Sequence, residues 1–563
     1  MPPGAGLGLD PSALPPRVRE VVSSSSSAGI PFRARTGHLH STWARTFSSL
    51  PELYIQPESL PEIEHAVSLA RRCGRRITTV GSGHSPSDLT CTSSWVMNLD
   101  NFDRVLHLDR DTGVVTMEAG IRLFQLCEYL DTQGLAMPNL GSINDQSIAG
   151  VISTGTHGSS VLHGLLSEDI LSLKIVLADG RTRTCSPTQD PDLFRAALLS
   201  LGALGIIAEV TFQAVPAFSL RWDQTIHADE TVLSRWAAGE LWAQADFVRV
   251  WWFPYMRRAV VWKADVVTAE DLSSGRQAHS DPPASYYDRA LGYYVYHNLL
   301  YLSRFVPRIL TWVEWFVFGM QYGFRNGAVS TTTGVQPSRQ ALLMNCLYSQ
   351  YVNEWALPLD KGPEALRRLG AWLQGLRPGD AGYVDHGIPF SSEGLYVHSP
   401  VEVRVSDSSR HKSAADSRPW LDPSLPDGPT LYLNAIMYRP YGLDPPHKDR
   451  YYEGFEWLMR DLGGRPHWAK NFRTAPDAAV EVERWYGDDL RSWRRVRDQA
   501  DPEGMFVGAW HRRLVLGGEA VGAGTRLRLE EAELRREKAV DGGVLWRGLL
   551  GGGEVRMNGR VKS

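Results

Sequence analysis

The sequence predicts an α+β protein with more than one domain. Its 563 residues exceed the about 100–200 residues that a single domain usually holds. Residues 59–80 join a helical pattern to a strand pattern, an alternation typical of an α+β nucleotide domain. Short strand signals separated by turns recur from residue 95 to residue 118. These observations together predict sheets with helices packed against them.

The composition excludes several classes of protein. A hydrophobic content of 43% with 22% charged residues is typical of a globular chain with large cores. A net charge of −4 gives no basic surface for DNA or RNA, so we expect no nucleic-acid partner. The five scattered cysteines form no CxxC pair, and the chain has neither an HExxH nor a GxSxG motif. We therefore expect no disulfide framework, no metal site and no hydrolase chemistry, and an intracellular location.

The first elements along the chain are a leader and a helix. Residues 1–36 are rich in Pro, Gly and Ser and contain the run Ser23–Ser27, which predicts a disordered leader. A secretory signal consists of a basic segment followed by an apolar one, and this stretch shows no such pattern, so we expect no secretory signal. Ser59 as N-cap and Pro61 in the first turn predict a helix that ends at Gly74.

A glycine-rich turn follows the strand predicted at residues 76–79. Its two glycines let the backbone approach a ligand, and successive N–H groups in such a turn form an anion-binding nest. A Rossmann fingerprint would require a third glycine where this chain has Pro86, which has no N–H to donate. The sequence therefore predicts a phosphate-binding turn of another type, made of Gly81, Ser82, Gly83, His84 and Ser85.

A second stretch of small residues runs from Asn139 to Gly158, with Ile148, Val151 and Ile152 as an apolar anchor. Small side chains and hydroxyls allow a large flat cofactor to lie against the backbone. Either stretch alone is compatible with an ordinary glycine-rich turn. Together with residues 202–207, they form a more specific cofactor-binding pattern.

The remaining elements of the first half are strands and one helix. A turn at Asp111–Gly113 predicts a hairpin between residues 105–108 and 114–118. Helical spacing covers residues 120–134, and two further strands are expected at residues 171–177 and 206–215. Polar residues 265–283 read as a loop.

Residues 286–324 are rich in Tyr, Trp and Phe. The longest uncharged run, Ala290–Ser303, is shorter than the ~20 residues that a membrane-spanning helix needs. The composition suits a pair of helices lying in a membrane interface, with Arg304 and Arg308 reaching lipid phosphates. The alternative is a helical excursion packed on the rest of the chain or on a second subunit.

Two short motifs in the second half carry charge. Glu402 and Arg404 alternate along a predicted strand and therefore face the same side of a sheet, where they form either a surface ion pair or part of a site. His467 and Lys470 follow the turn Gly463–Pro466.

Four motifs in this order, at residues 80–88, 139–158, 402–404 and 467–470, resemble the aldonolactone oxidase family of vanillyl-alcohol-oxidase-type FAD flavoproteins. The resemblance runs from about Trp43 to about Phe506 and is strongest to fungal and animal members. It implies a two-part PCMH-type FAD-binding domain followed by an α+β substrate domain with a mainly antiparallel sheet. The implied boundaries are residues 1–36 for the leader, 37–218 for the FAD-binding domain, 219–515 for the substrate domain with its aromatic insertion 286–324, and 516–563 for a low-complexity C-terminal extension.

The resemblance also implies how FAD is held. In covalent members of the family, the histidine that matches His84 bonds the flavin 8α-methyl, so we expect an 8α-histidyl-FAD. Related plant dehydrogenases carry Ala at the place of Gly141, and the missing methyl would leave a path for O2. His157 and His163 are weaker candidates. The expected FAD-binding residues are Gly81, Ser82, Gly83, His84, Ser85, Gly141, Ser142, Ser147, Gly150, Ser153, Thr154, Gly155, Thr156, Gly158, Ile207 and Lys470.

The catalytic roles follow from the same resemblance. Glu402 would bind the lactone hydroxyls, and Arg404 would stabilise negative charge developing on the substrate. Lys470 would stabilise negative charge on the reduced flavin, with His467 nearby. Either Glu402 or His467 is the candidate base for the substrate hydroxyl.

The implied reaction is the oxidation of an aldono-1,4-lactone by O2, with D-arabinono-1,4-lactone giving H2O2 and a dehydro-lactone, the precursor of erythroascorbate. The alternatives are L-gulono- or L-galactono-1,4-lactone as substrate, a dehydrogenase using cytochrome c or a quinone, and a catalytically silent flavin-binding scaffold. Because fungal and animal relatives are membrane-associated, we expect the mitochondrial outer membrane or another intracellular membrane.

Overall fold

The computed structural model confirms the α+β class with mainly antiparallel sheets. The C-terminal extension expected over residues 516–563 lies outside the described residues, apart from Leu516. The structure describes residues 9–25, 29–275, 277–282, 287, 289–324, 332–344, 348–398, 400–410, 418–472 and 478–516.

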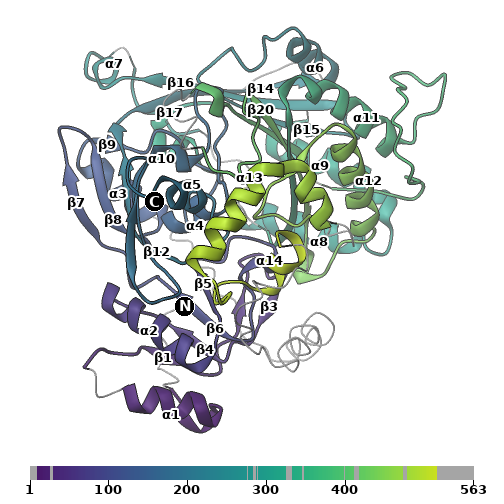
Figure 1. The fold of residues 1–563 in the computed structure, drawn as a ribbon. Helices are drawn as coiled ribbons and strands as arrows, with labels where there is room; N and C mark the ends of the chain where they lie inside the picture. The colour runs from purple at the N-terminus through teal and green to yellow at the C-terminus, as the bar shows by residue number, and fades with distance from the viewer. Residues whose placement is uncertain are drawn as a thin grey trace.

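A four-stranded sheet stands at the N-terminal end, in the lower part of Figure 1. Its strand order is β1 (Ala34–Arg35), β4 (Leu53–Ile55), β6 (Trp95–Asn98) and β5 (Ile77–Val80). β6 pairs in parallel with both β4 and β5, and α2 (Leu60–Cys73) makes the crossover between those two strands. The predicted helix therefore forms, and it ends at Gly74, whose φ of 64° is readily adopted only without a Cβ.

The expectation of a disordered leader is wrong for the described residues 9–25. This segment forms the 3₁₀ turn η1 (Pro11–Ala13) and the helix α1 (Pro16–Ser25). Leu14, Val18 and Val22, spaced four residues apart, are buried in the same core as α2. The spacing makes one apolar helical face, which the high Pro and Ser content of the segment obscured.

The five-stranded antiparallel sheet confirms the strands predicted between residues 105 and 215. In the hairpin between β7 (Val105–Asp109) and β8 (Val114–Glu118), Gly113 has φ 73°, and a Cβ there would lie 2.6 Å from the Ala214 carbonyl oxygen. The strand order is β11 (Thr182–Cys185), β10 (Ile170–Val176), β12 (Ile206–Gln213), β8 (Val114–Glu118) and β7 (Val105–Asp109). The helices of this region are α3 (Leu123–Thr132), α4 (Ile148–Ser153) and α5 (Pro191–Ala197).

An eight-stranded antiparallel sheet forms the second half of the molecule, in the upper part of Figure 1. Its order is β17 (Thr333–Pro337), β14 (Ser219–Ala228), β16 (Arg258–Val267), β15 (Phe247–Phe253), β19 (Val401–Ser406), β20 (Thr430–Tyr438), β18 (Gln350–Pro358) and β21 (Arg465–Pro466). Three helices share a core with one face of β15, β18, β19 and β20: α6 (Asp229–Ala237), α11 (Gly362–Gln374) and α12 (Lys448–Asp461). The opposite face of these four strands carries the site described below.

Shorter elements complete the described chain. The loop expected at residues 265–283 contains one helical turn, α7 (Ala269–Ser273), because Thr268 and Asp271 form a capping box. The other short elements are β2 (His40–Ser41), β3 (Ser48–Ser49), β9 (Leu135–Ala136), β13 (Val215–Pro216), α10 (Ser338–Ala341), η3 (Asp88–Thr90), η4 (Leu166–Asp169), η6 (Leu359–Lys361), η7 (Ser408–Arg410) and η9 (Pro440–Gly442).

The aromatic segment forms a helix pair, α8 (Ala290–Leu302) and α9 (Leu310–Tyr322), joined through η5 (Pro307–Ile309). Its inner face packs on Tyr348, Tyr438 and Phe253 of the substrate half. Its outer face leaves large apolar side chains exposed, namely Leu291, Tyr294, Tyr301, Leu302, Phe305, Val306, Trp312, Trp315 and Phe324. Within the described part of the chain, no helix combines the length and apolarity needed to cross a bilayer.

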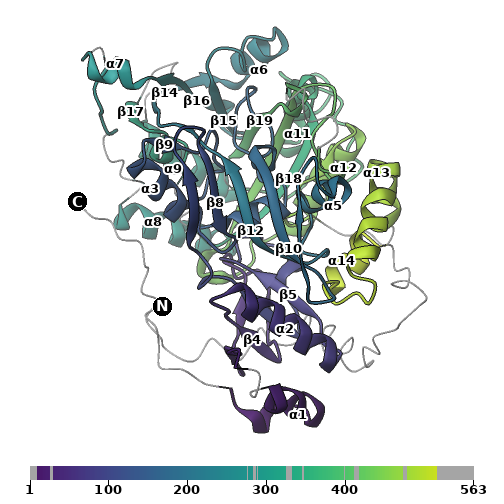
Figure 2. The same cartoon turned by 60° about the vertical axis from the view of Figure 1, so that its left-hand side comes forward.

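The last described elements, α13 (Ala478–Ala500) and α14 (Ala509–Leu514), return to the N-terminal half. Figure 2 shows α14 close to β5, and α13 above it at the right-hand edge, beside α12. α13 also contacts α5 of the N-terminal half. The buried residues of α13 and α14 share the core of residues 53–214, and the Ile77 amide donates to the Met505 carbonyl oxygen at 3.0 Å. Trp485 and Glu481 of α13 also contact Trp355 and Arg460 of the substrate half. Residues 478–516 therefore pack on both halves, and the boundary expected at residues 219–515 stays a prediction.

Candidate active site

The two glycine-rich stretches meet and line one cleft. A Cβ placed on Gly81 would lie 2.4 Å from Ser147 Oγ, so the turn after β5 is packed directly on the start of α4. Between β5 and β6 the chain forms only the three-residue η3, so the turn does not open a helix as a Rossmann turn does. The predicted cofactor residues that line this cleft are Gly81, Ser82, Gly83, His84, Ser85, Ser147, Gly150, Ser153, Thr154 and Ile207.

The chemistry of the cleft wall suits the phosphate and sugar groups of a dinucleotide such as FAD. Its walls carry glycines, hydroxyls and backbone amides, the donors that such groups require. Thr79 Oγ1 lies in the cleft wall, buried and without a hydrogen-bond partner in the described structure. Phe506 and His511 also line the cleft, so the returning C-terminal segment completes it.

His84 lies where the cleft meets a second, polar cavity, and it lines both. Its Nδ1 is 2.6 Å from Ser82 Oγ, and its ring stacks on Trp43 with a centroid distance of 5.2 Å. Burial, followed by the nearby charges of Arg122 and Lys470, lowers the pKa of His84 to about 4. The imidazole is therefore neutral at physiological pH and held in one orientation.

The polar cavity has a volume of about 110 Å³, well below the about 300–1,000 Å³ of pockets for drug-sized ligands. It brings together predicted residues from distant parts of the sequence. The predicted residues in its wall are His84, Ser85, Gly141, Ser142, Thr156, His157, Glu402, Arg404, His467 and Lys470.

Three of the polar side chains in this region form one row across the eight-stranded sheet. Glu354 on β18 is paired with Asn434 on β20, and Asn434 is paired with Glu402 on β19. Residues paired directly across strands project to the same face. Asn434 Nδ2 donates to Glu402 Oε2 at 3.2 Å, and Arg404 lies one pleat along on the same face of β19.

Arg404 connects the two carboxylates of the row. Its Nη2 donates to Glu354 Oε1 at 2.5 Å, and its Nε lies 3.8 Å from Glu402 Oε2. Arg249 approaches the other side of Glu402, with Nε 3.7 Å from Oε1. Burial acts to lower the pKa of Arg404, and the two glutamates outweigh it and raise that pKa.

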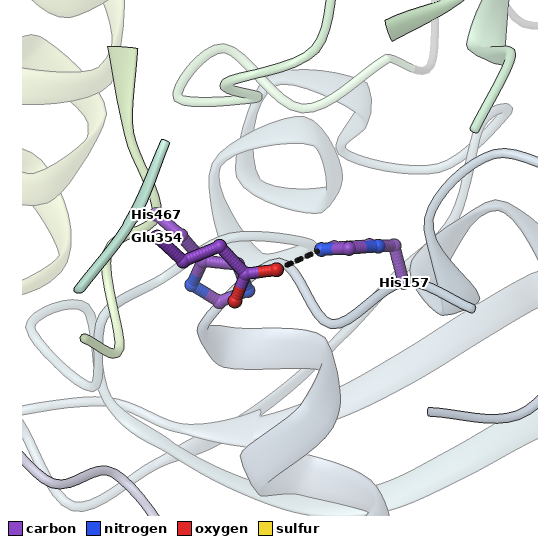
Figure 3. Close-up of side chains that lie close together, drawn as sticks. All are labelled: His157, Glu354 and His467. Carbon is purple, nitrogen blue, oxygen red and sulfur yellow. Dashed lines mark ion pairs between the residues drawn. The ribbon is translucent and has the colours of Figure 1, made fainter. Parts of the chain in front are cut away.

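A second group surrounds Glu354 (Figure 3). His157 Nε2 is 3.3 Å from Glu354 Oε1, the ion pair marked in the figure. Lys470 Nζ is 3.5 Å from Glu354 Oε2. His467 is held by its own backbone amide, which donates to the Glu354 carbonyl oxygen at 2.9 Å. Burial lowers the pKa of both His157 and His467, so both imidazoles are neutral near pH 7.

Three predicted residues lie elsewhere. Gly155 and Gly158 line neither cavity: Gly155 faces Leu199, and a Cβ on Gly158 would overlap the side chain of Asn139. His163 stacks on Phe247 at the edge of the substrate half. These glycines allow close packing of the chain beside the site.

Sequence reasoning missed the buried Glu354 behind the cavity wall and several residues of the wall itself. Glu354 and Asn434 each interrupt an otherwise largely apolar strand, QYVNEWALP and TLYLNAIMY, at a position facing the site. A polar residue at the centre of a buried strand was the available signal. The other missed wall residues are Ile143, Gln146, Met344, Gln350, Val352, Ile436, Tyr438 and Ala469.

The comparisons with known proteins agree with this architecture. Residues 51–186 match the family model of an FAD binding domain, and residues 210–514 match that of D-arabinono-1,4-lactone oxidase. A Neurospora crassa relative is 63% identical, covering 94% of this chain and 95% of its own length. D-arabinono-1,4-lactone oxidases of Yarrowia lipolytica and Saccharomyces cerevisiae are 41% and 36% identical, covering 84% and 85% of this chain and 96% of each relative.

Solved structures share the fold. A solvent-stable cholesterol oxidase superposes with a TM-score of 0.69 at 18% identity, covering 86% of this chain and 98% of its own. The xylooligosaccharide oxidase of Myceliophthora thermophila gives a TM-score of 0.60 at 17% identity, covering 88% and 98%. At these identities the likeness concerns the fold alone. The family match over more than half of the chain, with the curated relatives, shows that this protein belongs to the D-arabinono-1,4-lactone oxidase family.

Proposed function

We propose that this protein oxidises D-arabinono-1,4-lactone, using FAD and O2, to the dehydro-lactone that precedes erythroascorbate, with release of H2O2. The observation that carries the proposal is the convergence of Glu402, Arg404, Lys470 and His84 on one small polar cavity at the end of the glycine-rich cleft. Family membership supports the same reaction.

The cavity is suited to a polyhydroxylated ring. Ser142 Oγ, Arg404 Nε and Asn434 Oδ1 are buried in its wall without hydrogen-bond partners in the described structure. Buried polar atoms require partners, and the hydroxyls, ring oxygen and carbonyl of a sugar lactone supply both donors and acceptors. Glu402 accepts from a substrate hydroxyl, and Arg404 donates to the carbonyl oxygen, where negative charge develops.

Between the two candidate bases, the geometry favours Glu402. The Ala469 amide donates to His467 Nδ1 at 3.2 Å, so the neutral ring carries its proton on Nε2. His467 therefore presents a donor to the cavity. The Glu402 carboxylate is the acceptor that takes the hydroxyl proton as the substrate carbon is oxidised.

Bound FAD would supply the chemistry of electron-pair acceptance from the substrate carbon and of reoxidation by O2. The chain contributes the Lys470 ammonium, which lines the cavity close to His84 and stabilises negative charge there. Gly141 is part of the same wall, and we propose that O2 passes where this residue lacks a methyl group.

We further propose that FAD is bonded covalently through His84. A ring nitrogen must be unprotonated to form such a bond, and the lowered pKa of His84 meets that requirement. The stacked Trp43 ring and the Ser82 hydroxyl fix the imidazole at the junction of the two cavities.

A membrane location is likewise a proposal, with the mitochondrial outer membrane as the expected site or another intracellular membrane as the alternative. Its support is the outer face of α8 and α9, where exposed Trp312 and Trp315 accompany exposed Arg289 and Arg308. Aromatic rings and arginines together suit the headgroup region of a bilayer.

The test of the proposed reaction is a substrate panel. The purified full-length protein is mixed with D-arabinono-, L-gulono- and L-galactono-1,4-lactone in air, and H2O2 release is recorded with each. We expect the highest kcat/KM for D-arabinono-1,4-lactone. Release of no H2O2 together with reduction of cytochrome c or a quinone would assign the chain to the dehydrogenase alternative.

A further inference from the structure

Glu354 is a buried carboxylate directly behind the cavity wall. It is 0% exposed and does not itself line the cavity. A carboxylate buried without partners would be strongly unfavourable. Glu354 is instead surrounded by groups of the site: Arg404 donates to one oxygen, which His157 also approaches, and Lys470 faces the other.

The protonation states in this cluster follow from the surroundings. Burial acts to raise the pKa of Glu354, but the charges of Arg404 and Lys470 outweigh burial and hold that pKa well below its usual range. His467, like His157, has a pKa lowered by burial. Glu354 is therefore an anion beside two cations and two neutral imidazoles.

A metal ion is the obvious alternative occupant of this cluster. His157, Glu354 and His467 each offer a ligand atom within 4.8 Å of the others (Figure 3), and two imidazoles with one carboxylate form a known set for divalent transition metals. The Glu354 carboxylate, however, already has Arg404 and Lys470 as counter-charges. A divalent cation would be repelled at short range by both, so the geometry favours an ionic role.

We propose that Glu354 is a positioning residue, which holds the Arg404 guanidinium and the Lys470 ammonium at the cavity and limits the excess charge of the site. The kinetic part of this inference rests on the proposed lactone oxidation. Within the cluster, the cations Arg249, Arg404 and Lys470 face the carboxylates Glu354 and Glu402. One positive charge remains, enough to favour a developing substrate anion while limiting the capture of inorganic anions.

The experiment compares the full-length, FAD-loaded wild type with Glu354→Gln and Glu354→Asp. Glu354→Gln keeps the size of the side chain and removes its charge, so Arg404 and Lys470 lose their shared counter-charge. We expect kcat to fall by about 10²-fold, as when one transition-state contact is lost, with a much smaller change in KM. Glu354→Asp retains the charge one methylene further back, and we expect it to recover at least half of that loss on a logarithmic scale.

Sulfate provides a readout that does not depend on turnover. It is titrated into each protein and binding is followed by the visible difference spectrum of the bound flavin. With one more uncompensated positive charge, Glu354→Gln is expected to bind sulfate at least about tenfold more tightly than wild type, and Glu354→Asp to bind it about as wild type does. Should Glu354→Gln fail to fold, Glu354→Asp still tests the inference, through a lowered kcat at wild-type sulfate affinity.

Glu456 supplies the matched control. It is equally buried, accepts from Asn353 at 2.7 Å and pairs with Arg460, on the opposite side of β18 from the cavity. Glu456→Gln is expected to lower the melting temperature without altering sulfate affinity or the kcat of the folded fraction. If both glutamine variants behave alike, Glu354 has only a structural role and the inference fails.

Two further results would overturn the inference: a stoichiometric transition metal in the purified wild type, or sulfate affinity unchanged in Glu354→Gln. Failure of the proposed function would look different. In that case the wild type would turn over no lactone, while the sulfate affinities would still separate the variants.

Discussion

At the scale of single residues, Arg404 links the charged groups of the site, because it contacts both carboxylates of the cross-strand row. Lysine has a single charged nitrogen and cannot reproduce two separate contacts. We predict that Arg404→Lys slows anaerobic flavin reduction by D-arabinono-1,4-lactone by about 10²-fold, the usual loss for one electrostatic contact. Stopped-flow absorbance measures this rate. Arg460→Lys, at an arginine that pairs with Glu456 away from the cavity, serves as the control and should leave the rate unchanged.

His84 is the residue on which covalent attachment depends. We predict that wild-type protein precipitated with acid keeps its yellow flavin in the pellet, whereas His84→Ala releases all of its flavin to the supernatant. His163→Ala, which alters a half-buried histidine outside both cavities, should behave as wild type does. Flavin in the wild-type supernatant would show noncovalent binding.

Gly141 tests the path of O2. A methyl at this position would lie 3.1 Å from Thr156 Cγ2 and at least 3.7 Å from other atoms, so a small shift of one side chain accommodates it. We predict that Gly141→Ala slows flavin reoxidation by O2 by about tenfold, equivalent to about 1.4 kcal/mol in the activation barrier, with anaerobic reduction by lactone nearly unchanged. The two half-reactions are separated by double-mixing stopped flow. Unaltered O2 reactivity would exclude this path.

The sequence predicted the site residues that stand in local motifs, but it did not predict the residues that contact them from neighbouring strands. His84, Glu402, Arg404 and Lys470 stand in recognisable local patterns and all line the cavity. Glu354 lies in no such pattern, and its place in the site depends on which strands become neighbours. Cross-strand register is a long-range property that local sequence does not specify.

At the scale of elements, strand periodicity separates the two faces of the eight-stranded sheet. Along β20, Leu431, Leu433 and Ala435 pack under the helices, whereas Tyr432 and Asn434 face the site. This alternation was visible in the sequence, but the order of the strands was not. Likewise, the helix pair at residues 290–322 was predicted, and the packing of its inner face became clear only from the structure.

The exposed face of α8 and α9 leads to a prediction about membranes. Trp312 and Trp315 are 50% and 45% exposed. We predict that Trp312→Glu combined with Trp315→Glu abolishes cosedimentation with anionic lipid vesicles, because two carboxylates cannot enter the interface. Leu171→Glu, at a leucine 38% exposed on β10, is the control and should still sediment. If the wild type stays in the supernatant, the face serves another purpose.

Glu314 makes the same element sensitive to pH. Burial, only partly offset by backbone amides at Tyr255 and Met256, raises the pKa of Glu314 to about 8. The folded state then binds more protons than the unfolded state between about pH 4.5 and pH 8, so stability falls as pH rises through this window. We predict that Glu314→Gln raises the melting temperature by a few degrees at pH 8.5 and has little effect at pH 5. Calorimetry at both values checks this; an equal shift at both would contradict the assignment.

At the scale of the whole molecule, both halves of the chain contribute residues to the site, so neither half forms it alone. The cleft is made by the N-terminal sheets, the polar wall by the eight-stranded sheet, and the returning segment contributes Phe506 and His511 to the cleft. Arg513 of this segment also pairs with Asp88 beyond the glycine-rich turn, at 2.9 Å. A linear reading of the sequence divides the chain into consecutive domains and therefore cannot foresee a segment that crosses back.

The most direct measurement of the central claim is anaerobic mixing of the purified protein with D-arabinono-1,4-lactone, followed by admission of O2. If the cavity beside His84 oxidises lactones, the visible flavin band bleaches on mixing. It then returns with O2, and one H2O2 is released for each lactone consumed. A flavin band that the lactone leaves unchanged, or that recovers only with cytochrome c or a quinone, would contradict the claim.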